Sequence, residues 1–108
     1  MKCFMGLAMY RLDLRDCRSI KDKRRIVKSI IDRVGNGKTT AIREVGDPDL
    51  WKSSKLAVVC LSDSEKSAKN YLTRTREVME AIGVVVVEAG QYVFSADDVV
   101  ESILCQGE

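Results

Sequence analysis

Histidine is absent from the 108-residue chain, and only 6% of its residues are aromatic. Without imidazole there is no histidine zinc ligand, no triad base and no side chain that ordinarily titrates near neutral pH. The scarcity of aromatic residues counts against a nucleic-acid-binding sheet that stacks bases on its central strands. These absences remove much of the usual equipment of enzymes, and we expect a protein without catalytic activity and without a cofactor.

No apolar run approaches the ~20 residues that cross a bilayer, because Arg11, Asp13 and Arg15 break the apolar stretch that opens the chain. The same stretch lacks the continuous apolar centre of a secretory signal. The four cysteines lie far apart with no C-x-x-C pair, so neither a zinc knuckle nor a dithiol redox motif is predicted. We therefore expect a cytoplasmic protein with reduced thiols and no membrane contact.

The patterning predicts one small domain of alternating strands and helices. Ser19, the Ser62-Asp63 pair and Ser95 are expected to cap helices at their N-termini, the segment Gly35-Asn36-Gly37 and Gly83 are expected to end helices, and Gly46-Asp47-Pro48-Asp49 is rich in turn formers. The expected elements, in order, are a strand over 3–14, a helix over 20–34, a hairpin of strands at 39–45 and 55–61, a helix over 64–82, a strand over 84–94 and a short terminal helix.

This order is the split β-α-β-β-α-β arrangement called ferredoxin-like, an α+β fold with an antiparallel sheet and both long helices on one face. We expect the domain to span 1–94, followed by an acidic helical extension over 95–108. The first and third strands should lie at the centre of the sheet, and both carry apolar residues of both parities. The sheet face without helices therefore needs a cover. The terminal helix and a second copy of the chain are the two candidates, and we favour a homodimer.

Positive charge is concentrated before and within the first predicted helix, although the whole chain has a net charge of only +2. Between residues 11 and 33 there are nine basic and four acidic side chains. A one-sided positive helix face is an electrostatic footprint for phosphates, and a solvated face that only maintains solubility is the alternative. The candidate RNA-binding residues are Lys21, Lys23, Arg24, Arg25 and Lys28.

The predicted hairpin connection holds Asp47, Asp49 and Trp51. Two carboxylates at this spacing suit either a turn stabilised by bonds to the backbone or, together with other ligands, a divalent cation. Trp51 suits either a lid over the core or an exposed stacking platform. We take the segment as a structural or partner-binding loop and assign no metal.

Three phosphate-binding or nucleic-acid-binding patterns fail against the sequence. The Gly37-Lys38-Thr39-Thr40 run lacks the first glycine of a phosphate loop and precedes a strand instead of a helix. The third predicted strand, 55–61, has none of the aromatic residues of an RNA-reading sheet. No glycine between residues 14 and 19 is present to form the phosphate cradle of an acylphosphatase.

Two motifs resemble the YlxP-like family of small bacterial proteins, whose domain has no known function: the run Cys17-Arg-Ser-Ile-Lys-Asp-Lys-Arg-Arg25 and the run Glu44-Val-Gly-Asp-Pro-Asp-Leu-Trp51. The resemblance covers roughly residues 4–94. It implies a ferredoxin-like fold and, from the translation and transcription genes that often neighbour its members, a connection with RNA or the ribosome. This chain departs from the family at Gly35–Thr40 and in its acidic terminal helix.

We therefore predict a non-catalytic bacterial protein that binds RNA or a ribonucleoprotein such as the ribosome through its basic first helix, recognising shape more than sequence. The alternative is a regulatory or assembly module that dimerises through its sheet and binds a partner protein or a small ligand. The two differ in one observable property, because only the first requires salt-sensitive retention of RNA.

Overall fold

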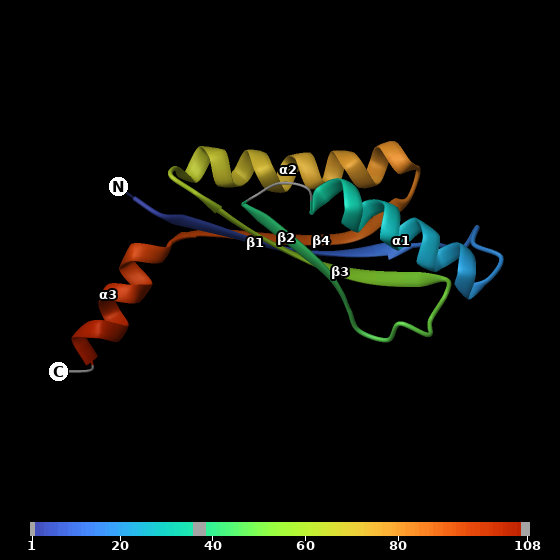
Figure 1. The fold of residues 1–108 in the computed structure, drawn as a ribbon, viewed down its shortest axis with the longest axis horizontal. Helices are drawn as coiled ribbons and strands as arrows, with labels where there is room; N and C mark the ends of the chain where they lie inside the picture. Colours follow the sequence, from blue (N-terminus) through green and yellow to red (C-terminus); the bar gives the residue numbers. More distant parts are fainter. Residues whose placement is uncertain (1, 36–38, 107–108) are drawn as a thin grey trace.

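The computed structural model describes residues 2–35 and 39–106 and contains four strands and three helices in these ranges (Figure 1). In chain order they are β1 (Phe4–Asp13), α1 (Ile20–Val34), β2 (Thr40–Val45), β3 (Ser53–Ser62), α2 (Glu65–Ile82), β4 (Val85–Ser95) and α3 (Ala96–Gln106). The order is the one that the sequence predicts, and most boundaries agree within two residues.

The four strands form one antiparallel sheet in the order β2-β3-β1-β4, with β1 and β3 at its centre as expected. Helices α1 and α2 lie side by side on one face of this sheet (Figure 1). The architecture is therefore the α+β, ferredoxin-like one. A register shift between Arg11 and Leu12 inserts a bulge where β1 pairs with the beginning of β4.

Helices α1 and α2 begin at the serines that precede them, because each hydroxyl accepts a backbone N–H three residues on. The Ser19 hydroxyl accepts from Asp22 and the Ser64 hydroxyl from Ser67, both at 3.1 Å. The cap of α2 is therefore Ser64 and not the expected Ser62-Asp63 pair. Gly83 ends α2 in the left-handed region, with φ of 98°. Gly35 ends α1 differently from our expectation, because its φ is −75° and its N–H bonds to the Ile31 carbonyl. Asn36 and Gly37 lie outside the described residues.

The core lies between the sheet and the two helices. Strand residues of one parity, among them Leu12, Leu56 and Val58, meet Ile30 of α1 and Leu72 of α2, and each is at most 1% exposed. The buried hydroxyl of Tyr10 donates a 3.0 Å hydrogen bond to the Leu72 carbonyl, so the ring packs without an unpaired polar atom. Cys17 and Cys60 are buried free thiols and Cys3 is a half-buried one.

The other face of the sheet, which we call the open face, carries none of the helices formed by the described residues (Figure 1). Its exposed large hydrophobic side chains come from three strands and include Leu7, Met9, Leu61 and Tyr92. The terminal helix α3 does not fold across them. It begins at Ala96 directly after β4 and projects past the end of the sheet. No helix in the described part of the chain is long and apolar enough to cross a membrane.

Candidate functional site

Four cations share the solvent side of α1, opposite the helix's buried stripe. Lys21, Arg24, Arg25 and Lys28 are all exposed, whereas Val27 and Ile30 face the core. Successive positions at spacings of three and four bring these side chains onto one surface of a helix. We call Lys21, Arg24, Arg25 and Lys28 the basic face.

Most of this charge is not consumed within the molecule. Arg25 pairs with Asp22 across 2.7 Å, but its side chain remains 77% exposed. Among the described residues, no carboxylate lies within 4.0 Å of Lys21, Arg24 or Lys28. Exposed cations without a carboxylate partner can bind an anion without first breaking an ion pair. The basic face is therefore available to an anionic partner.

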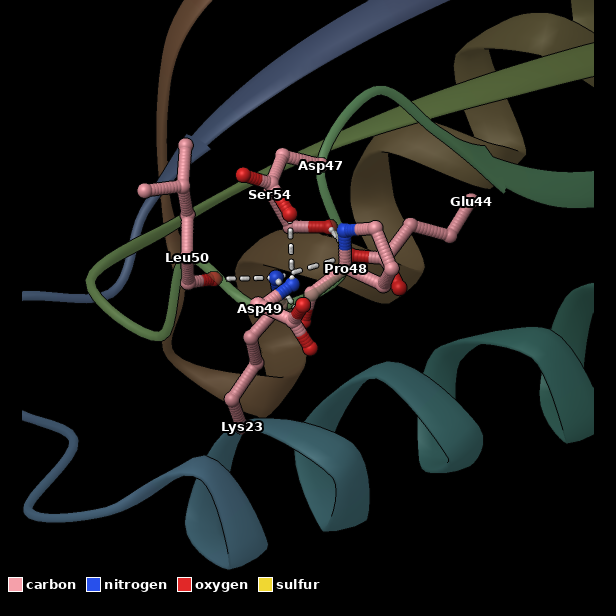
Figure 2. Close-up of polar contacts among 7 residues, drawn as sticks. All are labelled: Lys23, Glu44, Asp47, Pro48, Asp49, Leu50 and Ser54. Carbon is pink, nitrogen blue, oxygen red and sulfur yellow. Dashed lines mark hydrogen bonds and ion pairs between the residues drawn. The ribbon is translucent and has the colours of Figure 1, made fainter.

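Lys23 corrects the sequence-based prediction, because its side chain is 1% exposed and is not part of the basic face. Its Nζ lies 3.0 Å from the Glu44 Oε2. The same ammonium donates hydrogen bonds to the carbonyl of Pro48, at 3.2 Å, and to that of Leu50 (Figure 2). All three partners lie on β2 or on the connection to β3. An ammonium occupied in this way has no donor left for an RNA phosphate.

The same network continues through Glu44 to β3. The Ser54 hydroxyl donates a 2.7 Å hydrogen bond to the Glu44 carboxylate, and Ser54 itself is buried (Figure 2). No buried side-chain nitrogen or oxygen in the described part of the chain lacks a partner. We call Lys23, Glu44, Ser54 and the two loop carbonyls the lysine clamp. It joins the two sequence motifs that carry the family resemblance, one on α1 and one on the β2–β3 connection.

The buried position of Lys23 was visible in the spacing of α1. Residues 20, 23, 27, 30 and 34 form the inward stripe of the helix, and Lys23 is its only charged member. A lysine on an apolar stripe needs a buried acceptor, since an unpaired buried charge is costly. Glu44 is the acceptor that the sequence offers for Lys23. Its side chain faces the helices from β2, shortly before the turn that follows this strand.

The β2–β3 connection is built as a turn. The Asp47 carboxylate accepts a 2.9 Å hydrogen bond from the Asp49 N–H, and Gly46 adopts φ of 90°. This is the turn geometry that the sequence analysis offered for Asp47 and Asp49, and both side chains are exposed. Among the described residues no group of three or more cysteine or acidic side chains is placed to hold a metal ion. Trp51 is half-buried against the core, so it acts as a lid at this end.

A small groove extends the positive surface from α1 towards α2. Its volume is about 150 Å³, and two arginines, Arg33 and Arg74, stand on its two walls with the threonines Thr39 and Thr40. Both arginines are exposed, and neither has an ion-pair partner among the described residues. Sequence reasoning did not select them, because only packing of α1 beside α2 brings them together.

A pocket of about 580 Å³ lies at the N-terminal end of α1. Its charged groups are mostly paired internally: Arg15 donates a 2.7 Å bond to Asp13, which holds the pKa of that carboxyl below its usual range. Burial raises the pKa of the Cys17 thiol on its wall. A neutral, buried thiol is a poor nucleophile, so this pocket shows no activated group.

Comparison with known proteins agrees with this architecture. A family model described as "Protein of unknown function (DUF503)" matches residues 5–91. Over 70 residues the chain is 30% identical to the uncharacterized protein YlxP of Bacillus subtilis (strain 168). These 70 residues cover 65% of this chain and 76% of that protein. The resemblance to the YlxP-like family is thereby confirmed.

Two solved structures are similar in fold alone. The structural genomics protein YJCS superposes with a TM-score of 0.51 at 11% identity, covering 82% of this chain and 96% of its own. A VAO-type flavoprotein from Myceliophthora thermophila C1 gives a TM-score of 0.54 at 10% identity, covering 87% of this chain and 17% of its own. Proteins with little sequence identity to this chain thus share its fold. The match to the family model is a match in sequence, and this chain belongs to the family described as a protein of unknown function, DUF503.

Proposed function

We propose that the protein binds structured RNA, alone or within a ribonucleoprotein, through phosphate contacts made by the basic face. The observation that carries the proposal is the exposure of Lys21, Arg24 and Lys28 together with the lack of any carboxylate within 4.0 Å of them in the described chain. Phosphate contacts of this kind give affinity and orientation with little sequence information. The protein would act by binding and not by catalysis.

The shape of the surface favours a helical or folded RNA over a single strand. Single-strand readers stack bases on aromatic side chains, and α1 presents none. A convex row of cations instead suits phosphates along one groove of an RNA helix. Arg33 and Arg74 would extend the row, since the groove between them is of a size for one phosphate group and is bordered by hydroxyls of Thr39 and Thr40.

Lys23 supports the proposal in a different way from the one the sequence suggested. By fixing α1 to the β2–β3 connection through Glu44, it holds the helix in one orientation on the sheet. The exposed cations are therefore presented from a rigid support, which lowers the entropy lost when they engage phosphates.

The test is fluorescence anisotropy with a labelled RNA hairpin at several salt concentrations. The variant Arg24→Glu/Arg25→Glu/Lys28→Glu reverses three charges of the basic face. Affinity should fall at least about tenfold at ~0.1 M salt, and the slope of log K against log salt should shrink by about 2, near 0.7–0.9 per lost phosphate contact. Circular dichroism and the thermal midpoint should stay close to those of the parent, because all three side chains are exposed.

A matched control carries the same change of charge elsewhere. The variant Lys66→Glu/Lys69→Glu/Arg76→Glu reverses three exposed cations of α2 and leaves the basic face intact. It should retain most of the affinity. If the two triple variants lose equal affinity, attraction is non-specific, and if the α1 variant binds as well as the parent, the proposal is refuted.

A further inference from the structure

The terminal helix α3 and the open face both carry apolar surface that no other element of the described residues covers. On α3, Val99, Val100 and Ile103 lie within one arc of the helix and are 47%, 50% and 63% exposed. On the open face, Leu7 is 45% exposed although it lies on the central strand β1. Tyr92, on the edge strand β4, is 67% exposed. Contiguous exposed apolar surface of this kind marks an interaction site.

Helix α3 is prevented from covering its own sheet. No residue separates β4 from α3, so no loop is present to reverse the chain. The Ala96 N–H donates a 2.8 Å bond to the Cys3 carbonyl, and the Cys3 N–H donates a 2.9 Å bond to the Asp97 carboxylate. Together with the Ser95 hydroxyl, which accepts from Asp98, these bonds fix the helix in its projecting direction (Figure 1). No element of the described residues is thus placed to cover the open face.

We propose that a second copy of this chain covers the open face, with α3 of each copy laid across the sheet of the other. The dimensions agree: α3 has 11 residues and is about 16 Å long at 1.5 Å per residue. Four strands about 4.8 Å apart present a face about 14 Å across. One helix therefore spans the sheet, and a two-fold axis makes both contacts at once.

The charged side chains lie outside the proposed apolar contact. Asp97, Asp98 and Glu101 are on the side of α3 away from its apolar arc, so they remain in water when the arc packs on a sheet. On the open face, Arg43 and Lys55 are exposed on neighbouring strands and point to the same side as Met9 and Arg11. Arg11 pairs with Glu88 across 3.2 Å. The proposed contact therefore depends on the apolar side chains and not on ion pairs between the two copies.

The proposed contact does not depend on RNA binding. Helix α1 lies on the other side of the sheet, so the basic faces of both copies stay exposed in such a dimer. The family model ends at residue 91, before α3 begins. The helix that would cover the open face therefore lies outside the segment that the family model matches.

The test measures molar mass by light scattering and sedimentation of the full chain at micromolar concentration. The parent should have twice the 12.1 kDa mass of one chain. Ile103→Glu on α3 and Leu7→Glu on the open face should each be monomeric. An equimolar mixture of these two variants should regain dimers, because the intact helix of one copy meets the intact sheet of the other. Ala81→Glu, at an exposed site of α2 on the opposite side of the molecule, should leave the parent's mass unchanged.

Each result bears on the proposal. A monomeric parent, or a dimeric Ile103→Glu chain, would overturn it, the latter by showing that sheets pair without α3. A mixture that stays monomeric would exclude the reciprocal arrangement. Circular dichroism and urea unfolding verify that the variants fold. If the Leu7→Glu variant does not fold, Tyr92→Glu replaces it, because Tyr92 is 67% exposed.

Discussion

Replacing Lys23 by methionine tests how much the lysine clamp contributes to stability. Methionine retains much of the aliphatic stem and removes the ammonium, so the Glu44 carboxylate keeps the Ser54 hydroxyl and loses its counter-charge. Breaking a buried ion pair by removing one partner typically costs ~3–5 kcal/mol. The Glu44 side chain is 21% exposed, and Pro48 and Leu50 are exposed, so water can reach part of the site. We therefore expect a loss of about 3 kcal/mol, at the lower end of that range.

Urea unfolding at pH 7 measures this loss directly, and the thermal midpoint should fall by roughly 10–20 °C for a domain of this size. The matched control is Arg25→Met, which removes a cation from the same helix. Arg25 pairs with Asp22 at 2.7 Å but is 77% exposed, so its loss should cost less than about 1 kcal/mol. Equal losses in the two variants would contradict the importance of burial.

A second substitution separates the leftover charge from the lost contacts. Glu44→Gln in the Lys23→Met background neutralises the carboxylate while the amide oxygen still accepts from Ser54. Stability should recover by about 1 kcal/mol or more, since an uncompensated buried charge is the costly element. If Lys23→Met costs less than about 1 kcal/mol, or if Glu44→Gln adds to the loss, our account of the clamp is wrong.

Two further predictions concern the core. Gly6→Ala should destabilise the fold by about 1–3 kcal/mol in urea unfolding, because the added Cβ would lie 2.7 Å from the buried Cys60 Sγ, and Cys60→Ala should restore part of the loss. An unchanged midpoint would show that the site has room. Burial raises the pKa of the thiols of Cys17 and Cys60. As pH rises, these thiols ionise in the unfolded chain before they ionise in the folded one. Under reducing conditions the free energy of unfolding should therefore be highest below the ordinary thiol pKa and should decline as pH rises above it. A double Cys17→Ala/Cys60→Ala variant should lose this decline.

The helix boundaries could be predicted because their causes are local. Ser19 and Gly83 act through bonds to residues within five positions along the chain. The same reasoning failed at Gly35, whose φ is negative. A glycine permits a left-handed end to a helix without requiring one, and the choice is made by the chain that follows.

The central pairing of the sheet was also predictable, from the apolar composition of two strands and the handedness of crossovers. Lys23 was misassigned because counting cations along a segment ignores the direction in which each side chain points. Its partner, Glu44, lies on another element. The direction of α3 could not be predicted either, since it depends on hydrogen bonds from Ala96 and Asp97 to Cys3, near the other end of the chain.

The lysine clamp also limits how the family can vary in length. One ammonium binds Glu44 of β2 and the carbonyls of Pro48 and Leu50 on the connection to β3, and Ser54 at the start of β3 donates to the Glu44 carboxylate. Inserting or deleting a single residue there would move a carbonyl away from Nζ or shift Ser54 out of register with Glu44. Homologous chains that keep this lysine should therefore keep this connection at a constant number of residues, whereas indels should accumulate in other loops.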